Sequence, residues 1–326
     1  MRAIVITEPG GPEVLQIQEV ADPVPGDKEV LIAVKAFGVN HAETHMRKGE
    51  WPEATPISGI EAVGTVVTDP SGVLAGGTKV LTIMGGLGRT RNGSYAEYTV
   101  APAANVTRIQ TSLDWADLAA IPESYATAWL TLHSNLELEA GQWLLVRGAT
   151  SALGQAAVNI ASDLGARVIA TTRRADRAGL LRSLGAGSVV IDTGNIAGEV
   201  RHRVPDGVDR VLDLVGNSVL RDSLRAARVG GRLCQAGFLG GLGPVADFLP
   251  AADMPSGVQF SFFGSFEVGT GAYPISAIPF GEIVAKAEAG GYQAKPARVF
   301  AFEEIAAAHQ VMEAGQAAGK LVVTGA

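Results

Sequence analysis

Cysteine is nearly absent from this chain of 326 residues, whose only example is Cys234. One cysteine excludes a disulfide within the chain, and it excludes a zinc site built from several thiolates. Apolar runs are also short, and none approaches the roughly 18 residues that suggest a membrane span. The first residues, MRAIVITEPGG, hold too brief an apolar run for a secretory signal peptide. We therefore expect a cytoplasmic protein that has no membrane partner.

Basic residues are outnumbered, with 26 Lys and Arg against 33 Asp and Glu, which gives a net charge of −7. This balance argues against a nucleic-acid partner. Hydrophobic residues make up 47% of the chain and glycine occurs 41 times, as expected for a globular protein with many turns. The length predicts about two domains.

The pattern of predicted secondary structure changes once along the chain. Up to residue 119, short strands separated by Gly and Pro turns predict a barrel-like β domain without a long helix. Strands then alternate with helices until about residue 270, which predicts a parallel sheet with right-handed crossovers. The expected strands are 3–6, 14–19, 29–37, 64–68, 79–82, 94–100, 143–146, 167–171, 188–191, 208–214, 232–236, 297–300 and 320–324. The expected helical segments are 152–164, 174–184, 196–203, 217–228, 275–289 and 302–314.

The segment 143–165, WLLVRGATSALGQAAVNIASDLG, joins an apolar strand to a helix through a turn of small residues. Helix N-termini bind phosphate through backbone N–H groups and the helix dipole, and small side chains let the phosphates approach. The segment therefore predicts a dinucleotide site, although Gly154 is the only glycine at its G-x-G-x-x-G position. The alternative is a βαβ unit without a ligand. The turn consists of Ala149, Thr150, Ser151, Ala152, Leu153 and Gly154.

The end of the second strand selects between nicotinamide cofactors. An NAD-selective fold places a carboxylate there to bind the ribose hydroxyls. This chain instead has hydroxyls and guanidinium groups, which suit a 2′-phosphate and predict NADPH. These residues are Thr171, Thr172, Arg173, Arg174 and Arg177. The alternative is a solvated basic helix start, with Asp176 as a cap.

The sequence as a whole resembles the medium-chain dehydrogenase/reductase superfamily, and within it the zinc-free NADPH quinone oxidoreductases. The similar stretches are VKAFGVNHAETHMRKG, GIEAVGTV, GSYAEYTV, VRGATSALG, GVDRVLDLVG, GGRLCQAGFLGG and GKLVVTGA, which span residues 34–326 in the family's order. The resemblance implies a GroES-like catalytic domain of residues 1–119 and 271–326. It also implies a Rossmann domain of residues 120–270, an active-site cleft between the two, and a homodimer.

The metal ligands of the zinc-dependent relatives are missing at the similar positions. Those relatives have Cys where this chain has Asn40, and His where it has Ile60. Glu61, which follows, cannot hold zinc alone. The structural-zinc loop of four cysteines is also absent, so we expect no metal.

The resemblance places the reaction site on the segment that contains Asn40, Glu43 and His45. The amide of Asn40 could donate a hydrogen bond to the developing oxyanion of the substrate. His45 stands where relatives often have Tyr, and its imidazole could donate a proton. The alternative for His45 is an ordinary surface or partly buried side chain.

The resemblance also implies several cofactor contacts away from the small-residue turn. These residues are Asn40, Thr127, Val215, Phe238, Phe263 and Lys320. A structural role is the alternative for three of them: a helix residue for Thr127, core or interface for Phe263, and an ordinary surface lysine for Lys320. Position 192, often aromatic in relatives and stacked on adenine, is Asp here.

We thus expect a reductase that transfers hydride from NADPH to quinones or related activated carbonyl compounds. One alternative is an enoyl or alkenal reductase of the same superfamily that reduces a C=C bond. The other is an NADPH-binding sensor without catalytic turnover. The expected small-molecule partner is a quinone or an enone.

Overall fold

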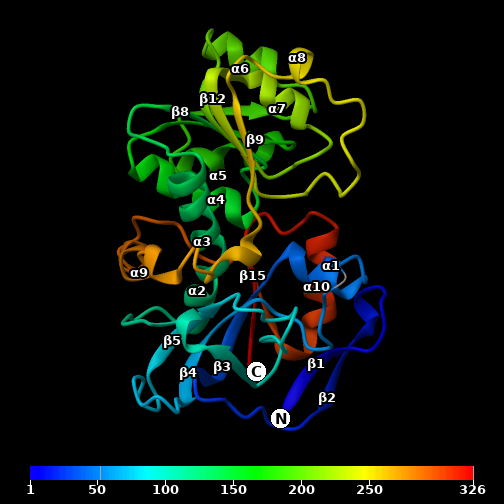
Figure 1. Ribbon diagram of the computed structural model, residues 1–326, viewed down its shortest axis with the longest axis vertical. Helices are drawn as coiled ribbons and strands as arrows, with labels where there is room; N and C mark the ends of the chain where they lie inside the picture. The colour runs from blue at the N-terminus through cyan, green and yellow to red at the C-terminus, as the bar shows by residue number, and fades with distance from the viewer. Residues whose placement is uncertain (52, 326) are drawn as a thin grey trace. The chain divides into compact units, whose positions relative to one another are not determined.

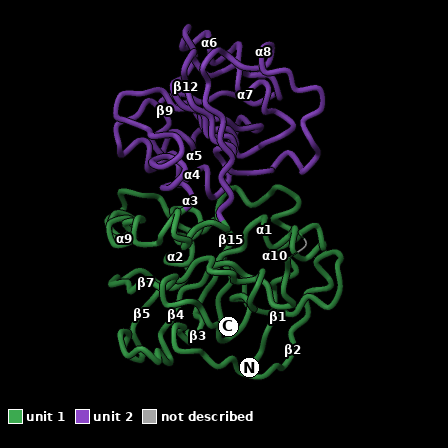
Figure 2. The backbone as a smooth tube through the Cα atoms, in the orientation of Figure 1, with its two compact units in different colours: residues 1–126, 266–326 green, residues 127–265 purple. Residues whose placement is uncertain are grey.

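A computed structural model describes residues 1–51 and 53–325, and the chain forms two compact units (Figure 2). Unit 1 comprises Met1–Ala126 and Phe266–Ala326, and unit 2 comprises Thr127–Ser265. These boundaries fall a few residues from those expected at 119/120 and 270/271. The reason at the first boundary is physical: helix α3 (Pro122–Leu130) runs through it, so no loop marks the change. No helix among the described residues is both long enough and apolar enough to span a membrane.

The centre of unit 1 is a mostly antiparallel sheet built around a long strand, β3 (Glu29–Val39). This strand pairs with β4, β6 and β15, and among the described strands of this sheet only β14 and β15 pair in parallel. Figure 1 shows β3 beside β4. The sheet consists of β14 (Arg298–Ala301), β15 (Leu321–Thr324), β3, β4 (Glu61–Thr68), β5 (Lys79–Ile83) and β7 (Val106–Arg108), with β6 (Tyr98–Pro102) beside β3. A separate hairpin is formed by β1 (Arg2–Ile6) and β2 (Leu15–Glu19).

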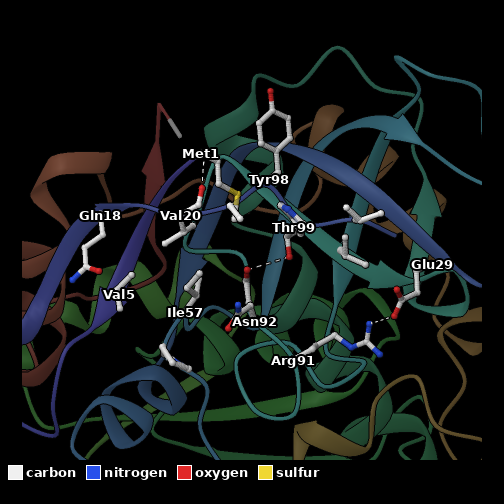
Figure 3. A pocket seen from close by; sticks show the side chains of 16 residues that line it. Met1, Val5, Gln18, Val20, Glu29, Ile57, Arg91, Asn92, Tyr98 and Thr99 are labelled. Carbon is white, nitrogen blue, oxygen red and sulfur yellow. Dashed lines mark hydrogen bonds and ion pairs between the residues drawn. The ribbon is translucent and has the colours of Figure 1, made fainter. Parts of the chain in front are cut away.

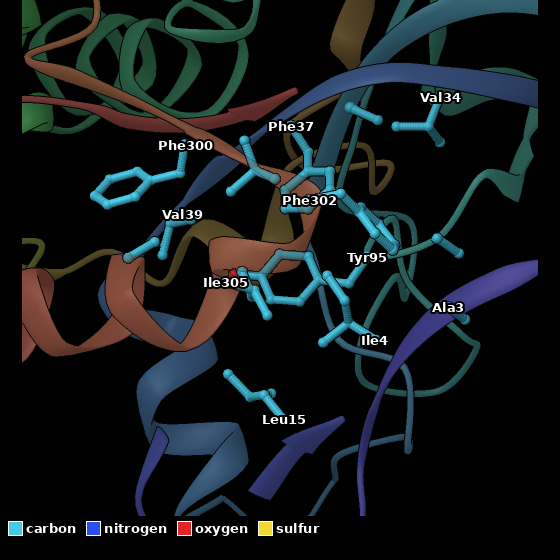
Figure 4. Packing of buried hydrophobic residues seen from close by; sticks show 14 of the residues in the cluster. Ala3, Ile4, Leu15, Val34, Phe37, Val39, Tyr95, Phe300, Phe302 and Ile305 are labelled. Carbon is cyan, nitrogen blue, oxygen red and sulfur yellow. The ribbon is translucent and has the colours of Figure 1, made fainter. Parts of the chain in front are cut away.

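An aromatic cluster fills the core of unit 1 beneath helix α10 (Ile305–Glu313). Phe37 stacks on Tyr95 with ring centroids 4.6 Å apart, and Phe302 meets Phe37 edge-on (Figure 4). All three side chains are buried. Because residues from β3, the loop before β6 and the C-terminal segment meet here, the cluster joins the two sequence-distant parts of unit 1.

Unit 2 is a parallel sheet in the order β10-β9-β8-β11-β12-β13. The change of direction in strand order lies between β8 and β11, where ligands bind in open α/β sheets. Its strands are β8 (Trp143–Arg147), β9 (Arg167–Thr172), β10 (Ser188–Ile191), β11 (Val208–Asp213), β12 (Ala227–Gln235) and β13 (Gln259–Phe262). The connecting helices are α4 (Ala152–Asp163), α5 (Ala178–Ser183), α6 (Ala197–Arg203), α7 (Leu220–Ala226) and α8 (Pro250–Asp253).

Helix α4 has clear signals at both ends. Its N-cap, Ser151, accepts a hydrogen bond from the N–H of Gly154, which satisfies one of the unpaired donors of the first turn. Gly165, with φ of +84°, ends the helix in the left-handed conformation that glycine adopts without strain. The predicted helix 152–164 therefore agrees with α4 to within one residue.

The β-rich N-terminal region also contains two short helices that the sequence analysis did not predict. These are α1 (His41–Arg47) and α2 (Trp115–Ala119). Each is too short to display a helical period, so only end signals could have revealed them. In α1 that signal is a capping box, in which Glu43 accepts from the backbone N–H of Asn40 at 2.8 Å. Helix α9 (Phe280–Glu288) also belongs to unit 1.

The predicted strand 94–100 is shifted in the structure, where β6 begins only at Tyr98. The residues before it form only an isolated bridge to β1, between Ala96 and Ala3, and otherwise pair with a loop. The N–H of Tyr95 donates to the carbonyl of Ser58, and the carbonyl of Tyr95 accepts from Ile4. The alternating pattern predicted that the backbone groups of these residues pair within a continuous strand. In the structure they form hydrogen bonds to other parts of unit 1 instead.

Candidate active site

Parallel pairing brings the predicted cofactor-binding residues of unit 2 to one edge of its sheet. Because the carboxyl ends of parallel strands lie at the same edge, the segments that follow β8, β9, β11, β12 and β13 are neighbours there. The small-residue turn follows β8, and the arginine-rich segment follows β9. Val215, Phe238 and Phe263 follow the other three strands.

The turn after β8 is closed by its own backbone. Gly148 has φ of +83°, and its N–H donates to the hydroxyl of Thr171 at 3.1 Å, which ties the turn to the end of β9. Gly154 is buried against this turn, since a Cβ there would lie 2.6 Å from both the Cα of Ala149 and the carbonyl oxygen of Gly148. The N–H groups of Ala152 and Leu153 have no acceptor within the helix. The structure thus combines a tightly packed backbone with donors at a helix start, which suits a pyrophosphate.

In the segment after β9 the threonine side chains are buried, whereas two of the arginine side chains are exposed. Thr171 and Thr172 are buried, and the Thr172 hydroxyl accepts from the N–H of Arg174 at 3.1 Å. Arg173 and Arg174 are exposed. Arg174 forms a two-point ion pair with Asp176 at 3.1 and 2.6 Å, so Asp176 contacts a neighbouring side chain instead of capping the helix.

The other predicted residues of unit 2 are held by hydrogen bonds or by packing within the unit. The N–H of Val215 donates to Asp213, and the ring of Phe238 lies 5.7 Å from that of Phe262. Phe263 is 3% exposed, as core packing requires. Thr127 is buried in α3, where its carbonyl accepts from Thr131. All of them remain candidates, and Thr127 and Phe263 have evident structural roles.

Arg147, which the sequence analysis did not single out, organises the loop beside this edge. Its side chain is fully buried at the end of β8. It donates two hydrogen bonds to Asp192, at 2.9 and 3.0 Å, and one to Asp222 at 2.9 Å. Asp192, read from the sequence only as the loss of an aromatic, is therefore one half of a buried ion pair. The signal available beforehand was an arginine at the end of an otherwise apolar strand.

The predicted reaction residues lie in unit 1, where a buried polar cluster surrounds Asn40. Its side-chain oxygen accepts from the ammonium of Lys320 at 2.6 Å. Its side-chain nitrogen donates to Glu61 at 2.9 Å and to Glu43 at 3.3 Å. The structure thus brings Asn40, Glu43 and Lys320 together, and adds Glu61 to them.

These charges fix the orientation of the Asn40 amide. Its oxygen faces a cation and its nitrogen faces two carboxylates, and the reverse orientation would oppose like partners. Both amide hydrogens are engaged in this arrangement. The predicted donation from Asn40 to a substrate oxyanion therefore requires one of these hydrogen bonds to break.

Glu43 gives this cluster a pH dependence. Burial raises the pKa of Glu43 from 4.5 to about 7, with Lys320 opposing the rise and Glu61 adding to it. Because the pKa is higher in the folded state, the contribution of Glu43 to stability is full below about pH 4.5 and is lost as the pH rises through 7. We expect the stability of the wild type relative to Glu43→Gln to fall by roughly 3 kcal/mol across this window. Urea unfolding of both proteins over a pH series measures the difference.

Glutamine is a suitable replacement because it keeps the capping-box geometry without the charge. Glu282→Gln, at an exposed position of α9, is the matched control and should leave the pH dependence unchanged. Parallel stability curves for the wild type and Glu43→Gln would contradict the assignment.

His45 has two partners that the sequence analysis missed. Its Nδ1 lies 2.5 Å from a carboxylate oxygen of Glu50, and its ring stacks on Trp51 at 5.6 Å. A carboxylate at Nδ1 selects the tautomer that carries a hydrogen there, so Nε2 remains for other partners. The two residues directly follow the turn after α1, and only this proximity in sequence hinted at them.

A pocket of about 540 Å³ opens elsewhere in unit 1 (Figure 3). Apolar side chains such as Val5 and Ile57 line it, together with an ion pair between Arg91 and Glu29 at 2.5 Å. None of the predicted site residues lines this pocket. It is therefore a feature of the β domain that is distinct from the candidate active site.

Comparison with known proteins agrees with this architecture. A family described as "Alcohol dehydrogenase GroES-like domain" matches residues 26–111, and one described as "Zinc-binding dehydrogenase" matches residues 184–323. The human protein named quinone oxidoreductase is 32% identical over 248 residues, which cover 74% of each chain.

Among the solved structures that match the whole chain are the following two. One is a mycobacterial protein in complex with NADPH, at 28% identity and a TM-score of 0.88, with complete coverage of both chains. The other is described as an NAD-dependent alcohol dehydrogenase, at 30% identity and a TM-score of 0.85, also with complete coverage. Given the α/β fold with its GroES-like and Rossmann units, and these relatives, the chain belongs to the medium-chain dehydrogenase/reductase superfamily and is similar to its quinone oxidoreductases.

Proposed function

We propose that this protein is an NADPH-dependent, zinc-independent reductase that transfers hydride to quinones or related activated carbonyl compounds. Membership of the superfamily supports an NAD(P)-dependent oxidoreductase. The observation that carries the finer proposal is the packed turn after β8 beside an arginine-rich segment after β9. The name of the human relative supports quinones as the substrate class.

The residues of unit 2 fit a dinucleotide cofactor. The turn from Ala149 to Gly154 would hold the pyrophosphate through its N–H groups, because the small residues Ala149, Ala152 and Gly154 let phosphates approach the backbone. Arg173, Arg174 and Arg177 would hold the 2′-phosphate. When bound, NADPH supplies the hydride.

The proposed zinc independence rests on the donor atoms around Asn40. Structural and catalytic zinc sites use thiolates, imidazoles and carboxylates. The corresponding positions hold an amide in Asn40 and a buried hydrocarbon in Ile60, and the carboxylate of Glu61 binds an ammonium. These residues do not fit zinc. Metal analysis of the purified protein that found one tightly bound zinc per chain would overturn this part of the proposal.

Residues of unit 1 would stabilise the negative charge that develops on the substrate oxygen. A reduced quinone or carbonyl carries negative charge on oxygen and needs hydrogen-bond donors or a proton. We assign the proton to His45, whose imidazolium form would donate it from Nε2 while Nδ1–H donates to Glu50. Asn40 is the candidate hydrogen-bond donor.

A spectrophotometric panel of NADPH oxidation with quinones, 2-alkenals, enones and enoyl thioesters tests the proposal. We expect the highest kcat/KM with quinones. Preference for alkenals or enoyl thioesters would favour the C=C reductase instead. Tight NADPH binding without turnover of any acceptor would favour the sensor.

Cofactor selectivity gives a sharper prediction at the arginine-rich segment. Alanine at Arg173 or Arg177 should weaken NADPH binding about tenfold each, because a charge-assisted hydrogen bond to the 2′-phosphate is lost, and should leave NADH binding unchanged. Asp176→Asn should have the opposite effect, since it releases Arg174 from its ion pair and removes a repelling charge. Titration calorimetry with both cofactors measures these changes. Equal kcat/KM with NADPH and NADH in the wild type would contradict the assignment.

We also propose a homodimer formed through the free edge of β13. This strand ends the sheet of unit 2, and Phe260 and Phe262 on it are 45% and 51% exposed. An apolar strand with one unpaired edge is a template for pairing with a second copy. Sedimentation of the wild type and of Phe260→Lys tests this, and a monomeric wild type would contradict it.

A further inference from the structure

The ammonium of Lys320 is enclosed by oxygen atoms from three separate parts of unit 1. It donates to the side-chain oxygen of Asn40 at 2.6 Å and forms a buried ion pair with Glu61. A carboxylate oxygen of Glu123 lies 4.0 Å away. The side chain of Lys320 is 3% exposed and that of Glu61 is fully buried. Three elements far apart in sequence therefore converge on this cation: the end of β3, the start of β4 and the first turn of α3.

The fold leaves room for this cation at Gly38. A Cβ built on Gly38 in β3 would lie 2.3 Å from Cε of Lys320 and 2.3 Å from a carboxylate oxygen of Glu61. It would also lie 2.8 Å from the ammonium nitrogen. Any side chain at this position would displace the ion pair, so the missing side chain of Gly38 opens the space that the pair fills.

The charges around the ammonium hold it in its protonated form. Burial alone lowers the pKa of a lysine, but Glu61 and Glu123 outweigh this effect and raise the pKa of Lys320 above its ordinary value. The second oxygen of Glu61 accepts the backbone N–H of Glu123 at 2.8 Å, which keeps the carboxylate in place. The site is therefore built for a permanent positive charge.

We propose that the ammonium of Lys320 is a tethered cation in an oxygen-lined site, where it fixes the orientation of the Asn40 carboxamide. Lys320 is thus a positioning residue for the reaction, a role that rests on the proposed function. It differs from the cofactor contact that the family resemblance implies for this lysine. An ammonium that is already bound by Asn40 and Glu61 is not available to a phosphate group.

Replacing the tether tests the cation site directly. Lys320→Ala removes Cγ, Cδ, Cε and Nζ, which together correspond to n-propylammonium. We expect this variant to lose thermal stability and at least about tenfold in kcat/KM, because Asn40 loses its fixed orientation. Added n-propylammonium chloride should restore both in a saturable manner, because a cation that binds only the folded protein stabilises it. n-Propanol, which has a similar shape but no charge, should restore neither.

Lys295→Ala is the matched control, because Lys295 is 84% exposed and its nearest acid, Asp117, lies 3.8 Å away. Neither this variant nor the wild type should respond to n-propylammonium beyond the effect of an equal concentration of choline chloride. The inference is overturned if Lys320→Ala does not respond to the amine. It is also overturned if this variant retains its kcat and loses only NADPH affinity, as a cofactor contact would.

A second pair of variants covers the case in which Lys320→Ala does not fold. Lys320→Met fills the volume but leaves Glu61 as a buried carboxylate without its cation, so its melting temperature should fall. Adding Glu61→Gln should recover most of that loss if the cation serves to balance Glu61. No recovery would count against the site. The melting temperatures remain informative if the wild type reduces no acceptor, in which case the proposed function fails while the cation site is still tested.

Discussion

Replacing Arg147 by leucine should lower the free energy of unfolding by about 3–5 kcal/mol, because it leaves two largely buried carboxylates without their shared cation. The side chain of Arg147 is 0% exposed, and those of Asp192 and Asp222 are 8% and 13% exposed. Leucine restores the apolar contacts of the stem but none of the hydrogen bonds. Equilibrium urea unfolding of the wild type and of Arg147→Leu measures the loss.

The cost is large because Arg147 connects the end of β8 to two other segments, the loop after β10 and the start of α7. Besides the two aspartates, it donates to the carbonyl of Gly194 at 3.0 Å and to that of Val219 at 3.3 Å. Asp222 in turn accepts the backbone N–H groups at the start of α6. Although burial raises the pKa of Asp192, the hydrogen bonds from Arg147 and from the N–H of Gly194 hold it below its ordinary value. Without the guanidinium, the loop after β10 loses its anchor to the centre of the sheet.

Two variants separate the charge from the hydrogen-bonding fork. Arg147→Lys keeps the charge and loses the planar geometry, so an intermediate loss is expected. Arg228→Ala removes a half-exposed ion pair with Asp209 at 2.7 Å and should cost less than about 1 kcal/mol. Arg147→Leu costing no more than Arg228→Ala would refute the role given to the buried network.

The parts of the site that were predictable are those encoded locally. The segment from Trp143 to Gly165 contains its strand, its turn and both helix ends within a short stretch, so the pattern alone located β8 and α4. The parallel sheet then follows from alternation, because consecutive parallel strands require crossovers. Because the carboxyl ends of parallel strands lie at one edge, the edge where the candidate cofactor residues lie could be predicted from the same pattern.

The parts that were not predictable depend on contacts between distant residues. Asn40 and Lys320 are separated by 280 positions and meet through the pairing of β15 with β3. Nothing local distinguishes Lys320 from a surface lysine at a strand start. Arg147 in β8 and Asp192 after β10 likewise lie 45 positions apart, and the sequence alone indicated for Asp192 only the loss of an aromatic. Short helices such as α1 were missed because tertiary contacts and a capping box, rather than a hydrophobic period, define them.

Replacing Gly154 by alanine should weaken NADPH binding by about 10- to 100-fold, since overpacking of this kind costs about 1–3 kcal/mol and that strain falls on the cofactor site. The added Cβ would lie 2.6 Å from the Cα of Ala149 and 2.8 Å from its carbonyl carbon. These are backbone atoms, so the turn itself must move away from the helix start. Titration calorimetry measures the affinity, and thermal unfolding of the same sample separates a distorted turn from a lost fold.

The same substitution at Gly198 is the control, and it reverses the expectation. Gly198 lies in α6, where an added Cβ would have no atom within 4 Å. Because alanine restricts the unfolded chain and favours the helix, Gly198→Ala should stabilise the protein by about 0.5–1 kcal/mol and leave NADPH binding unchanged. The two glycines thus differ only in what surrounds them. If Gly154→Ala keeps the affinity and stability of the wild type, the turn is not held by close packing of its backbone, and the assignment of the pyrophosphate site loses its physical basis.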